Sequence, residues 1–154
     1  MVSVLIPHYG DPAPAQHLAS ALAEQQVRQV VVVDDASPTP FPDCERVTVV
    51  RRSHNGGFGA AVNSGAHAAT GDLLLILNSD LEIRPTFVSD FLKASAPFQP
   101  AVTGPAVLDR AGHTAYTGRH FPTVGHQTTE WLTPLARFRD RPGLHEAVGH
   151  DTRA

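Results

Sequence analysis

The chain has 154 residues, of which 42% are hydrophobic and 18% charged, and its formal net charge is −3. This length allows one domain with a real core, and the composition excludes a chain that is mostly disordered. The weak negative charge argues against nucleic-acid binding, and the longest apolar run is far shorter than the roughly 20 residues of a membrane span.

The start of the chain and its cysteine content bear on location. Met1 is followed by neither the basic start nor the long apolar region of a signal peptide. Cys44 is the only cysteine, so no disulfide can form within the chain, as is usual in a reducing compartment. We therefore expect a cytoplasmic protein, either free or at the cytoplasmic face of the membrane. The sequence does not indicate an oligomeric state.

The first 40 residues predict two strands with a helix between them. The apolar run Val2–Ile6, closed by a proline, predicts a buried strand over residues 2–6. Asp11-Pro12 is typical of a helix start, and the apolar spacing that follows predicts a helix over 13–26. Four consecutive valines predict a second buried strand over 30–33, which must end before the proline-rich segment 38–42.

The middle of the chain repeats this alternation. Residues 47–50 predict a short third strand, and a helix over 58–69 follows. The five aliphatic residues Leu73–Leu77 predict a strand buried on both faces, and another helix is expected over 86–96. The apolar face of the helix over 58–69 is expected to carry Phe58, Ala61, Val62, Gly65 and Ala69.

Strands that alternate with helices pair in parallel through right-handed crossovers. The pattern therefore predicts an α/β fold with a mostly parallel sheet and helices on both faces. Residues 101–108 predict one more strand, and 109–112 predict a turn. Because no strong period follows, we expect an α/β domain over 1–112 and an irregular segment over 113–154.

Two of the predicted strands end in polar side chains. Residues 30–33 are followed by Asp34 and Asp35, and Leu73–Leu77 is followed by Asn78-Ser79-Asp80. In open α/β sheets, ligands bind at the carboxyl ends of the strands. An aspartate there, with a second oxygen-bearing side chain two residues away, suits a hard divalent cation that holds a phosphate. The sequence therefore predicts a Mg²⁺ or Mn²⁺ site at Asp80.

Two loops complete the predicted site. Tyr9, after the first strand, can stack on a base, and a carboxylate after the second strand can accept from a pyrimidine ring N–H. Gly56 and Gly57 would let the backbone approach a diphosphate at a helix start. Simpler interpretations are open: Asp34 and Asp35 in an Asx-type turn, and Tyr9 packed against the first helix.

The same segments resemble family 2 of the inverting glycosyltransferases, which have the GT-A fold. Residues 2–9, 32–37, 55–65 and 71–80 carry the resemblance, and their order and spacing all fit. Residues 104–112 resemble the continuation in the rhamnosyltransferase-like branch. The resemblance implies the donor-binding part of an enzyme that transfers a hexosyl or rhamnosyl group from a UDP or dTDP sugar. The acceptor would be a glycan or a lipid-linked molecule, in cell-envelope polysaccharide synthesis.

The resemblance also implies roles for single residues. Asp34 and Asp35 would contact the nucleoside, and Asn78 with Asp80 would form the metal motif, in which asparagine replaces the first aspartate. Some relatives reach the diphosphate with a basic residue in the 55–58 loop; here backbone N–H groups, Arg51 or Arg52 would do so. The expected donor-binding residues are Pro7, Tyr9, Asp34, Asp35, Ser37, Asn55, Gly56, Gly57, Asn63 and Asn78, with Asp80 as the metal ligand.

No catalytic base is assigned, because family members carry theirs in a later segment, often as a Glu-Asp pair. The remaining acids have no such context: Asp109, Glu130, Asp140, Glu146 and Asp151. Two alternatives stay open. One is a dinucleotide-dependent oxidoreductase, for which Gly57-Phe58-Gly59 is a partial fingerprint with Val62 at the third glycine. The other is a non-catalytic nucleotide-sugar-binding or interaction domain.

Overall fold

The computed structural model describes residues 1–105, 107–108 and 113–115. The chain divides into two units, Met1–Pro100 and Ala101–Ala154, and each is described by itself. The first unit contains β1 (Val2–His8), α1 (Pro12–Ala23), β2 (Gln29–Asp34), β3 (Val47–Arg51), α2 (Phe58–Ala68), β4 (Leu73–Ile76), α3 (Phe87–Ser95) and the 3₁₀ helix η1 (Ala96–Phe98). No helix among the described residues is long and apolar enough to cross a membrane.

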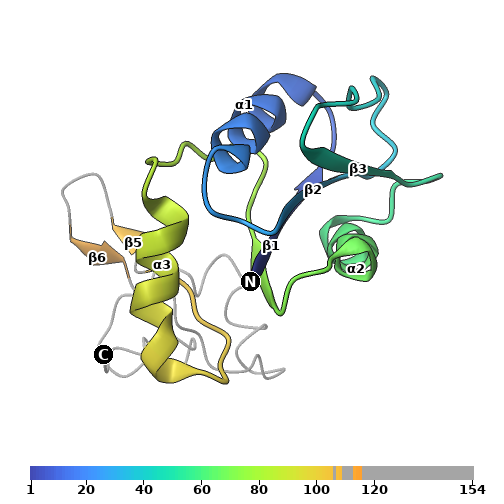
Figure 1. The fold of residues 1–154 in the computed structure, drawn as a ribbon. Helices are drawn as coiled ribbons and strands as arrows, with labels where there is room; N and C mark the ends of the chain where they lie inside the picture. The colour runs from blue at the N-terminus through green and yellow to red at the C-terminus, as the bar shows by residue number, and fades with distance from the viewer. Residues whose placement is uncertain (106, 109–112, 116–154) are drawn as a thin grey trace, which may run out of the picture. The chain divides into compact units, whose positions relative to one another are not determined.

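The first unit is built on a four-stranded sheet in the order β3-β2-β1-β4 (Figure 1). All its neighbouring strands pair in parallel, with Val4 opposite Val30 on one side of β1 and opposite Leu75 on the other. In Figure 1, α1 and α2 lie on opposite sides of this sheet. The predicted α/β fold with a parallel sheet and helices on both faces is therefore confirmed.

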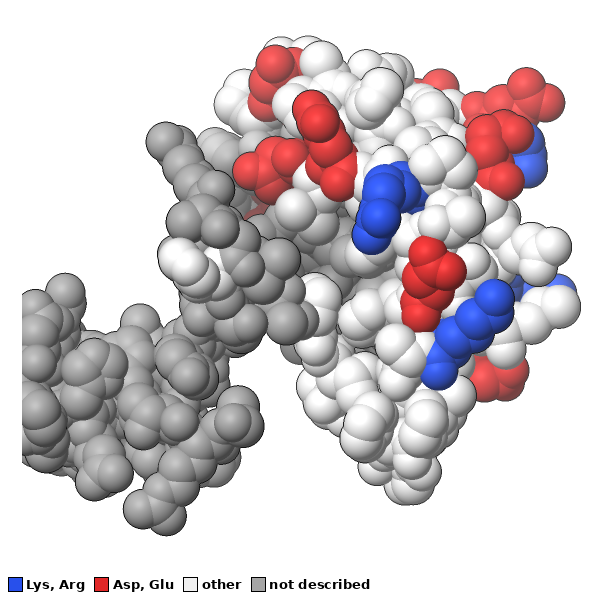
Figure 2. Space-filling view, turned by 90° about the vertical axis from the view of Figure 1, so that its left-hand side faces the viewer, with Lys and Arg blue, Asp and Glu red and all other residues white. Residues whose placement is uncertain are grey.

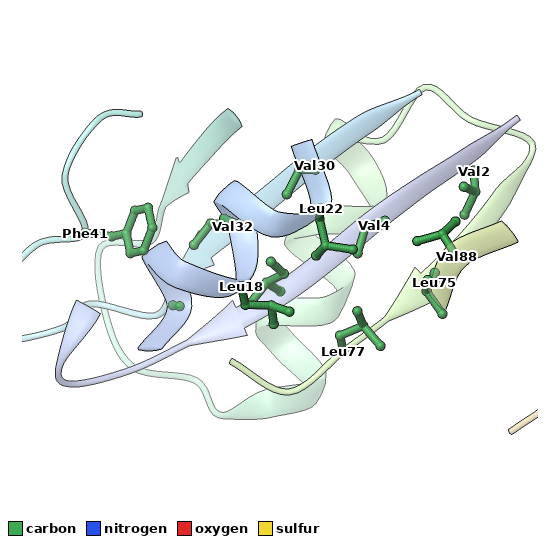
Figure 3. Packing of buried hydrophobic residues seen from close by; sticks show 13 residues of the cluster. Val2, Val4, Leu18, Leu22, Val30, Val32, Phe41, Leu75, Leu77 and Val88 are labelled. Carbon is green, nitrogen blue, oxygen red and sulfur yellow. The ribbon is translucent and has the colours of Figure 1, made fainter. Parts of the chain in front are cut away.

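The core follows from the alternation of side chains along the two central strands. Val4, Ile6, Val30 and Val32 are buried in the cluster that α1 and α3 cover (Figure 3). The intervening residues of β1 and β2 form a second cluster with α2: Leu5, Val31, Val33 and Ala61. Because both faces of β1 and β2 are buried, their carboxyl ends are held in fixed positions.

The predicted burial of Leu73–Leu77 on both faces is wrong. Leu75 and Leu77 are buried, but Leu74 and Ile76 are 48% and 44% exposed. β4 is the last strand on its side of the sheet among the described residues, and α2 packs over β1, β2 and β3 instead. An apolar run does not reveal which neighbouring helix covers each face.

Element ends differ by a few residues from the predictions. α1 ends at Ala23 rather than residue 26. Beyond its end, the Gln25 side-chain nitrogen donates to the Arg84 carbonyl (3.2 Å), and its oxygen accepts from the Val88 N–H (3.0 Å) in α3. α1 begins as expected, with the Asp11 carboxylate accepting from the Ala13 N–H (3.0 Å).

In the second unit, Val107–Leu108 (β5) pairs antiparallel with Thr114–Ala115 (β6). The strand expected over 101–108 is wrong for residues 101–105, which form no strand. The turn expected over 109–112 and most of the irregular segment expected over 113–154 lie outside the described residues. The predicted domain boundary after residue 112 stays a prediction.

Candidate functional site

The candidate site lies at the carboxyl edge of the sheet, beside β1 and β2. Pairing of these strands ends with His8 opposite Asp34. Immediately beyond is a pocket of about 180 Å³. It is lined by Pro7, His8, Tyr9, Asp35, Asn55, Gly57, Phe58 and Ala61. The structure thus brings five of the predicted donor-binding residues to one pocket: Pro7, Tyr9, Asp35, Asn55 and Gly57.

Asp34 is buried and fastens the loop that follows β2. Its Oδ1 accepts from the Ser37 N–H and its Oδ2 from the Phe41 N–H, both at 2.9 Å. Burial alone would raise the pKa of Asp34, but hydrogen bonds from Ser37 and Phe41 outweigh it and hold the pKa below its ordinary value. The geometry favours the Asx-type interpretation for Asp34, whose predicted contact with a nucleoside stays a prediction.

Ser37 joins the loops that follow β1 and β2. Its hydroxyl accepts from the Gly10 N–H (3.0 Å), and Gly10 has a φ of 107°, which glycine adopts without strain. The adjacent Tyr9 is 57% exposed and lines the pocket. Ser37 is not among the residues that line the pocket, but its bond to Gly10 holds the loop that presents Tyr9 to it.

Asp35 connects β2 to the start of α2. Its Oδ2 accepts from the Gly57 N–H (2.7 Å), both its oxygens lie 3.1 Å from the Gly56 nitrogen, and its Oδ1 accepts from Arg52 Nη1 (2.5 Å). The Asp35 and Arg52 side chains are 5% and 15% exposed. A carboxylate of the protein itself thus occupies the N-terminus of α2, where the helix dipole and free N–H groups favour an anion.

This arrangement changes the expected basis of diphosphate binding. The N–H groups of Gly56 and Gly57 donate to Asp35, Arg52 pairs with Asp35, and Arg51 pairs with Asp43 at 3.0 Å. A Cβ on Gly56 would lie 2.7 Å from Arg52 Nη1, so this glycine makes room for the arginine. The groups that we expected to reach a diphosphate are therefore already engaged within the protein.

The predicted asparagines and Asp80 divide between the pocket lining and positions outside it. Asn55 lines the pocket, and its Oδ1 accepts from the Gly57 N–H (3.0 Å). Asn63 is exposed on α2 and does not line it. Asn78 and Asp80 are exposed just beyond β4, where the Leu77 N–H still donates to the Leu5 carbonyl (3.0 Å). Both residues therefore leave the sheet at its carboxyl edge, as predicted, but outside the pocket lining.

The donor set at Asp80 fits a cation that is shared with a ligand. No group of three or more His, Cys, Asp or Glu side chains in the described part of the chain could hold a metal by itself. Mg²⁺ is commonly bound by one or two carboxylates together with substrate phosphates and water. Asn78, Ser79 and Asp80 offer hard oxygen ligands of this kind.

Sequence reasoning missed His8, which is only 3% exposed. Its ring meets Phe41 edge-on, with the centroids 5.5 Å apart, and its Nε2 has no hydrogen-bond partner. Burial lowers the pKa of His8, and the opposing effects of Asp34, the Gly10 backbone and Asp11 do not cancel this. The signal available in the sequence was its even spacing from Val4 and Ile6, which places it on the α1 face of β1.

The shifted pKa of His8 predicts a loss of stability in mild acid. Below its ordinary pKa of 6.5 the unfolded chain binds a proton at His8 that the folded protein does not, so the free energy of unfolding should fall as the pH drops from about 6.5. Asp34 adds a second loss below its ordinary pKa of 3.8, because the folded carboxylate resists protonation. Urea unfolding between pH 8 and pH 3 measures both.

His8→Gln should flatten the upper part of this profile, whereas His17→Gln should not, since His17 is exposed on α1. An unchanged slope between pH 7 and pH 5 in His8→Gln would show that the assignment to His8 is wrong.

Comparison with known proteins agrees with this architecture. The family model described as Glycosyl transferase family 2 matches residues 3–151. The chain belongs to this family. Two curated relatives are a dolichol-phosphate mannosyltransferase from Pyrococcus furiosus, 31% identical over 107 residues, and an uncharacterized glycosyltransferase from Haemophilus influenzae, 33% identical over 90 residues. These matches cover 60% and 52% of this chain, but only 29% of each relative.

Solved structures of glycosyltransferases share the fold. Mannosyltransferase PcManGT from Pyrobaculum calidifontis, in complex with GDP-Man and Mn²⁺, is 25% identical with a TM-score of 0.55, over 62% of this chain and 32% of that one. S. aureus TarS is 22% identical with a TM-score of 0.51, over 71% and 24%. The predicted GT-A fold is therefore confirmed. This chain spans about a third or less of the length of these proteins, so their complete activities are not assigned to it.

Proposed function

We propose that this family 2 chain binds the nucleoside part of a nucleoside-diphosphate sugar, as the donor site of a glycosyltransferase. The observation that carries the proposal is that Tyr9, Asp35 and Asn55 line one pocket at the carboxyl edge of the sheet. An exposed aromatic ring supports stacking on a base, and the carboxylate and amide groups support hydrogen bonds to its edge.

We further propose a pyrimidine base, as in a UDP or dTDP sugar. The pocket of about 180 Å³ is smaller than the roughly 300–1,000 Å³ of sites that enclose drug-sized ligands. This volume suits a single ring better than a purine or a complete nucleotide sugar. The GDP-Man in PcManGT makes guanine the alternative that the experiment must exclude.

The diphosphate is proposed to bind with Mg²⁺ or Mn²⁺ at Asp80. With Arg51 and Arg52 both paired to carboxylates, the charge of a diphosphate calls for another cation. When bound, the cation offsets the charge that the departing nucleoside diphosphate gains. The Mn²⁺ in PcManGT supports this proposal. We assign no catalytic base among the described acids, and transfer with inversion to a glycan or lipid-linked acceptor stays a prediction.

Calorimetry with UDP, dTDP and GDP, each with and without Mn²⁺, tests the proposed donor. We expect the two pyrimidine nucleotides to bind more tightly than GDP, and Mn²⁺ to strengthen both. Undetectable binding of all three would contradict the proposed donor site. Tight binding of NADH would instead favour the oxidoreductase. In such an enzyme the Gly56 and Gly57 N–H groups would bind the cofactor's pyrophosphate, whereas here they donate to Asp35.

Replacing Asp80 tests the metal. Asp80→Asn is expected to weaken Mn²⁺-dependent UDP binding by at least ~1 kcal/mol, about fivefold, because a charged ligand is lost. The fold should be unaffected, since the side chain is exposed. The matched control is Asp72→Asn at the other end of β4, where the exposed carboxylate pairs with the N-terminal amino group at 2.8 Å. Equal, parental binding by both variants would refute the assignment to Asp80.

A further inference from the structure

Phe58 belongs to the predicted apolar face of α2 but is exposed. It is the first residue of α2 and shares a helical stripe with Ala61 and Gly65, both of which are buried against the sheet. Phe58 itself is 56% exposed and lines the pocket. The predicted apolar face of α2 is thus buried at Ala61 and Gly65 but not at its first residue. The Phe58 ring therefore borders the pocket rather than the sheet.

Hydrogen bonds to both the N–H and the carbonyl of Gly57 fix the backbone beside Phe58. Gly57 has a φ of 81°, and its N–H donates to Asp35 Oδ2 (2.7 Å) and lies 3.0 Å from Asn55 Oδ1. The Gly57 carbonyl accepts from the Ala61 N–H (3.0 Å). The aromatic ring is therefore attached to a constrained helix start, and side-chain rotation is its main freedom. A ring held in this way loses little entropy when it binds a ligand.

Phe58 is one of two exposed aromatic residues at the same pocket. The other is Tyr9, and both side chains are more than half exposed. The third exposed aromatic among the described residues, Phe98, does not line the pocket. Large apolar side chains that are exposed around a pocket indicate a binding site, because a ligand that covers them removes apolar surface from water. A flat, weakly polar ring would cover both.

Polar atoms beside these rings define the ligand further. The Asn55 side chain lines the pocket, and its amide nitrogen has no hydrogen bond within the described residues. A ligand that satisfies it and covers the rings needs hydrogen-bonding atoms at its edge and an apolar face. A nucleobase has this chemistry, whereas a sugar carries hydroxyl groups around its whole ring.

We propose that Phe58 is a positioning and specificity-determining residue that supplies a second aromatic contact, besides Tyr9, for the pyrimidine base of the donor. The inference rests on the proposed donor site and adds to it a residue that acts on the base and not on the diphosphate. On the face of the described part shown in Figure 2, acidic and basic side chains are interspersed, and no large basic patch offers a rival phosphate site there.

Calorimetry on the full chain tests the proposal, with UDP and with inorganic pyrophosphate as a base-free probe, both in Mn²⁺. Phe58→Ala should weaken UDP binding by about fivefold to about 150-fold, the range for loss of one base–aromatic stack. Pyrophosphate binding should not change, and Phe58→Tyr should bind UDP at close to parental affinity. Phe98→Ala, which removes an even more exposed ring outside the pocket lining, should match the parent in both titrations.

The outcomes separate this inference from the function on which it rests. If Tyr9→Ala weakens UDP binding but Phe58→Ala does not, the donor site stands and the role of Phe58 is wrong. If Phe58→Ala loses UDP and pyrophosphate equally, its effect is structural and the inference is likewise overturned. If the parent chain binds no UDP, the proposed function and the inference both fail.

Discussion

Asp35→Asn is expected to lower the free energy of unfolding by about 3–5 kcal/mol, the usual effect of breaking a buried ion pair. The substitution leaves the Arg52 guanidinium without its carboxylate, and the new amide group directs donors toward the N–H groups of Gly56 or Gly57. Because these contacts hold the start of α2 beside β2, UDP binding should fall below detection. Urea unfolding and calorimetry measure the two effects.

A matched control and a second variant make this prediction decisive. Asp43→Asn removes the carboxylate of an exposed ion pair with Arg51 and should cost less than about 1 kcal/mol. Arg52→Met combined with Asp35→Asn removes both charges and should be more stable than the sum of the single effects predicts. Equal stability of Asp35→Asn and Asp43→Asn would show that the buried pair does not hold the loop.

Asp34→Asn is expected to lower the free energy of unfolding by about 3 kcal/mol, although the two side chains have nearly the same shape. An amide can accept from only one of the Ser37 and Phe41 N–H groups, and the other then loses a charge-assisted hydrogen bond in a buried place. The loop after β2 should loosen, and with it the link from Ser37 to Gly10 that positions Tyr9.

Asp11→Asn is the control for this substitution. Asp11 also accepts a backbone N–H, from Ala13, but as an exposed helix cap, a position at which asparagine is as good as aspartate. Its unfolding should therefore match that of the parent. If Asp34→Asn keeps parental stability yet loses UDP binding, Asp34 contacts the nucleoside directly and its assignment to the loop is wrong.

The two aspartates show how the site depends on the fold. Successive residues of a strand point to opposite faces, so Asp34 and Asp35 enter different surroundings: one faces the loop that carries Phe41, the other faces α2. Asp35 neutralises Arg52 and takes the helix N-terminus. The pocket therefore presents to a ligand mainly aromatic rings and single hydrogen-bonding atoms, which suits a base better than a phosphate.

The sequence by itself determined the strands, helices and their order, because these depend on local patterns. The valines of β2, the Asp11-Pro12 cap of α1 and the glycines before α2 act within a few residues of themselves. Once strands and helices alternate, parallel pairing follows, and with it the edge at which Tyr9, Asp35 and Asn78 leave the sheet.

Only the tertiary structure decided what each polar or apolar group contacts, since those partners come from distant parts of the chain. The Asp35 carboxylate meets N–H groups and an arginine at least 17 residues away, which spacing alone does not reveal. The exposure of Leu74 and Phe58 likewise depends on where α2 begins and which strands it covers. Local patterns predict that a residue is apolar or charged, whereas its surroundings after folding determine whether it builds the core or the site.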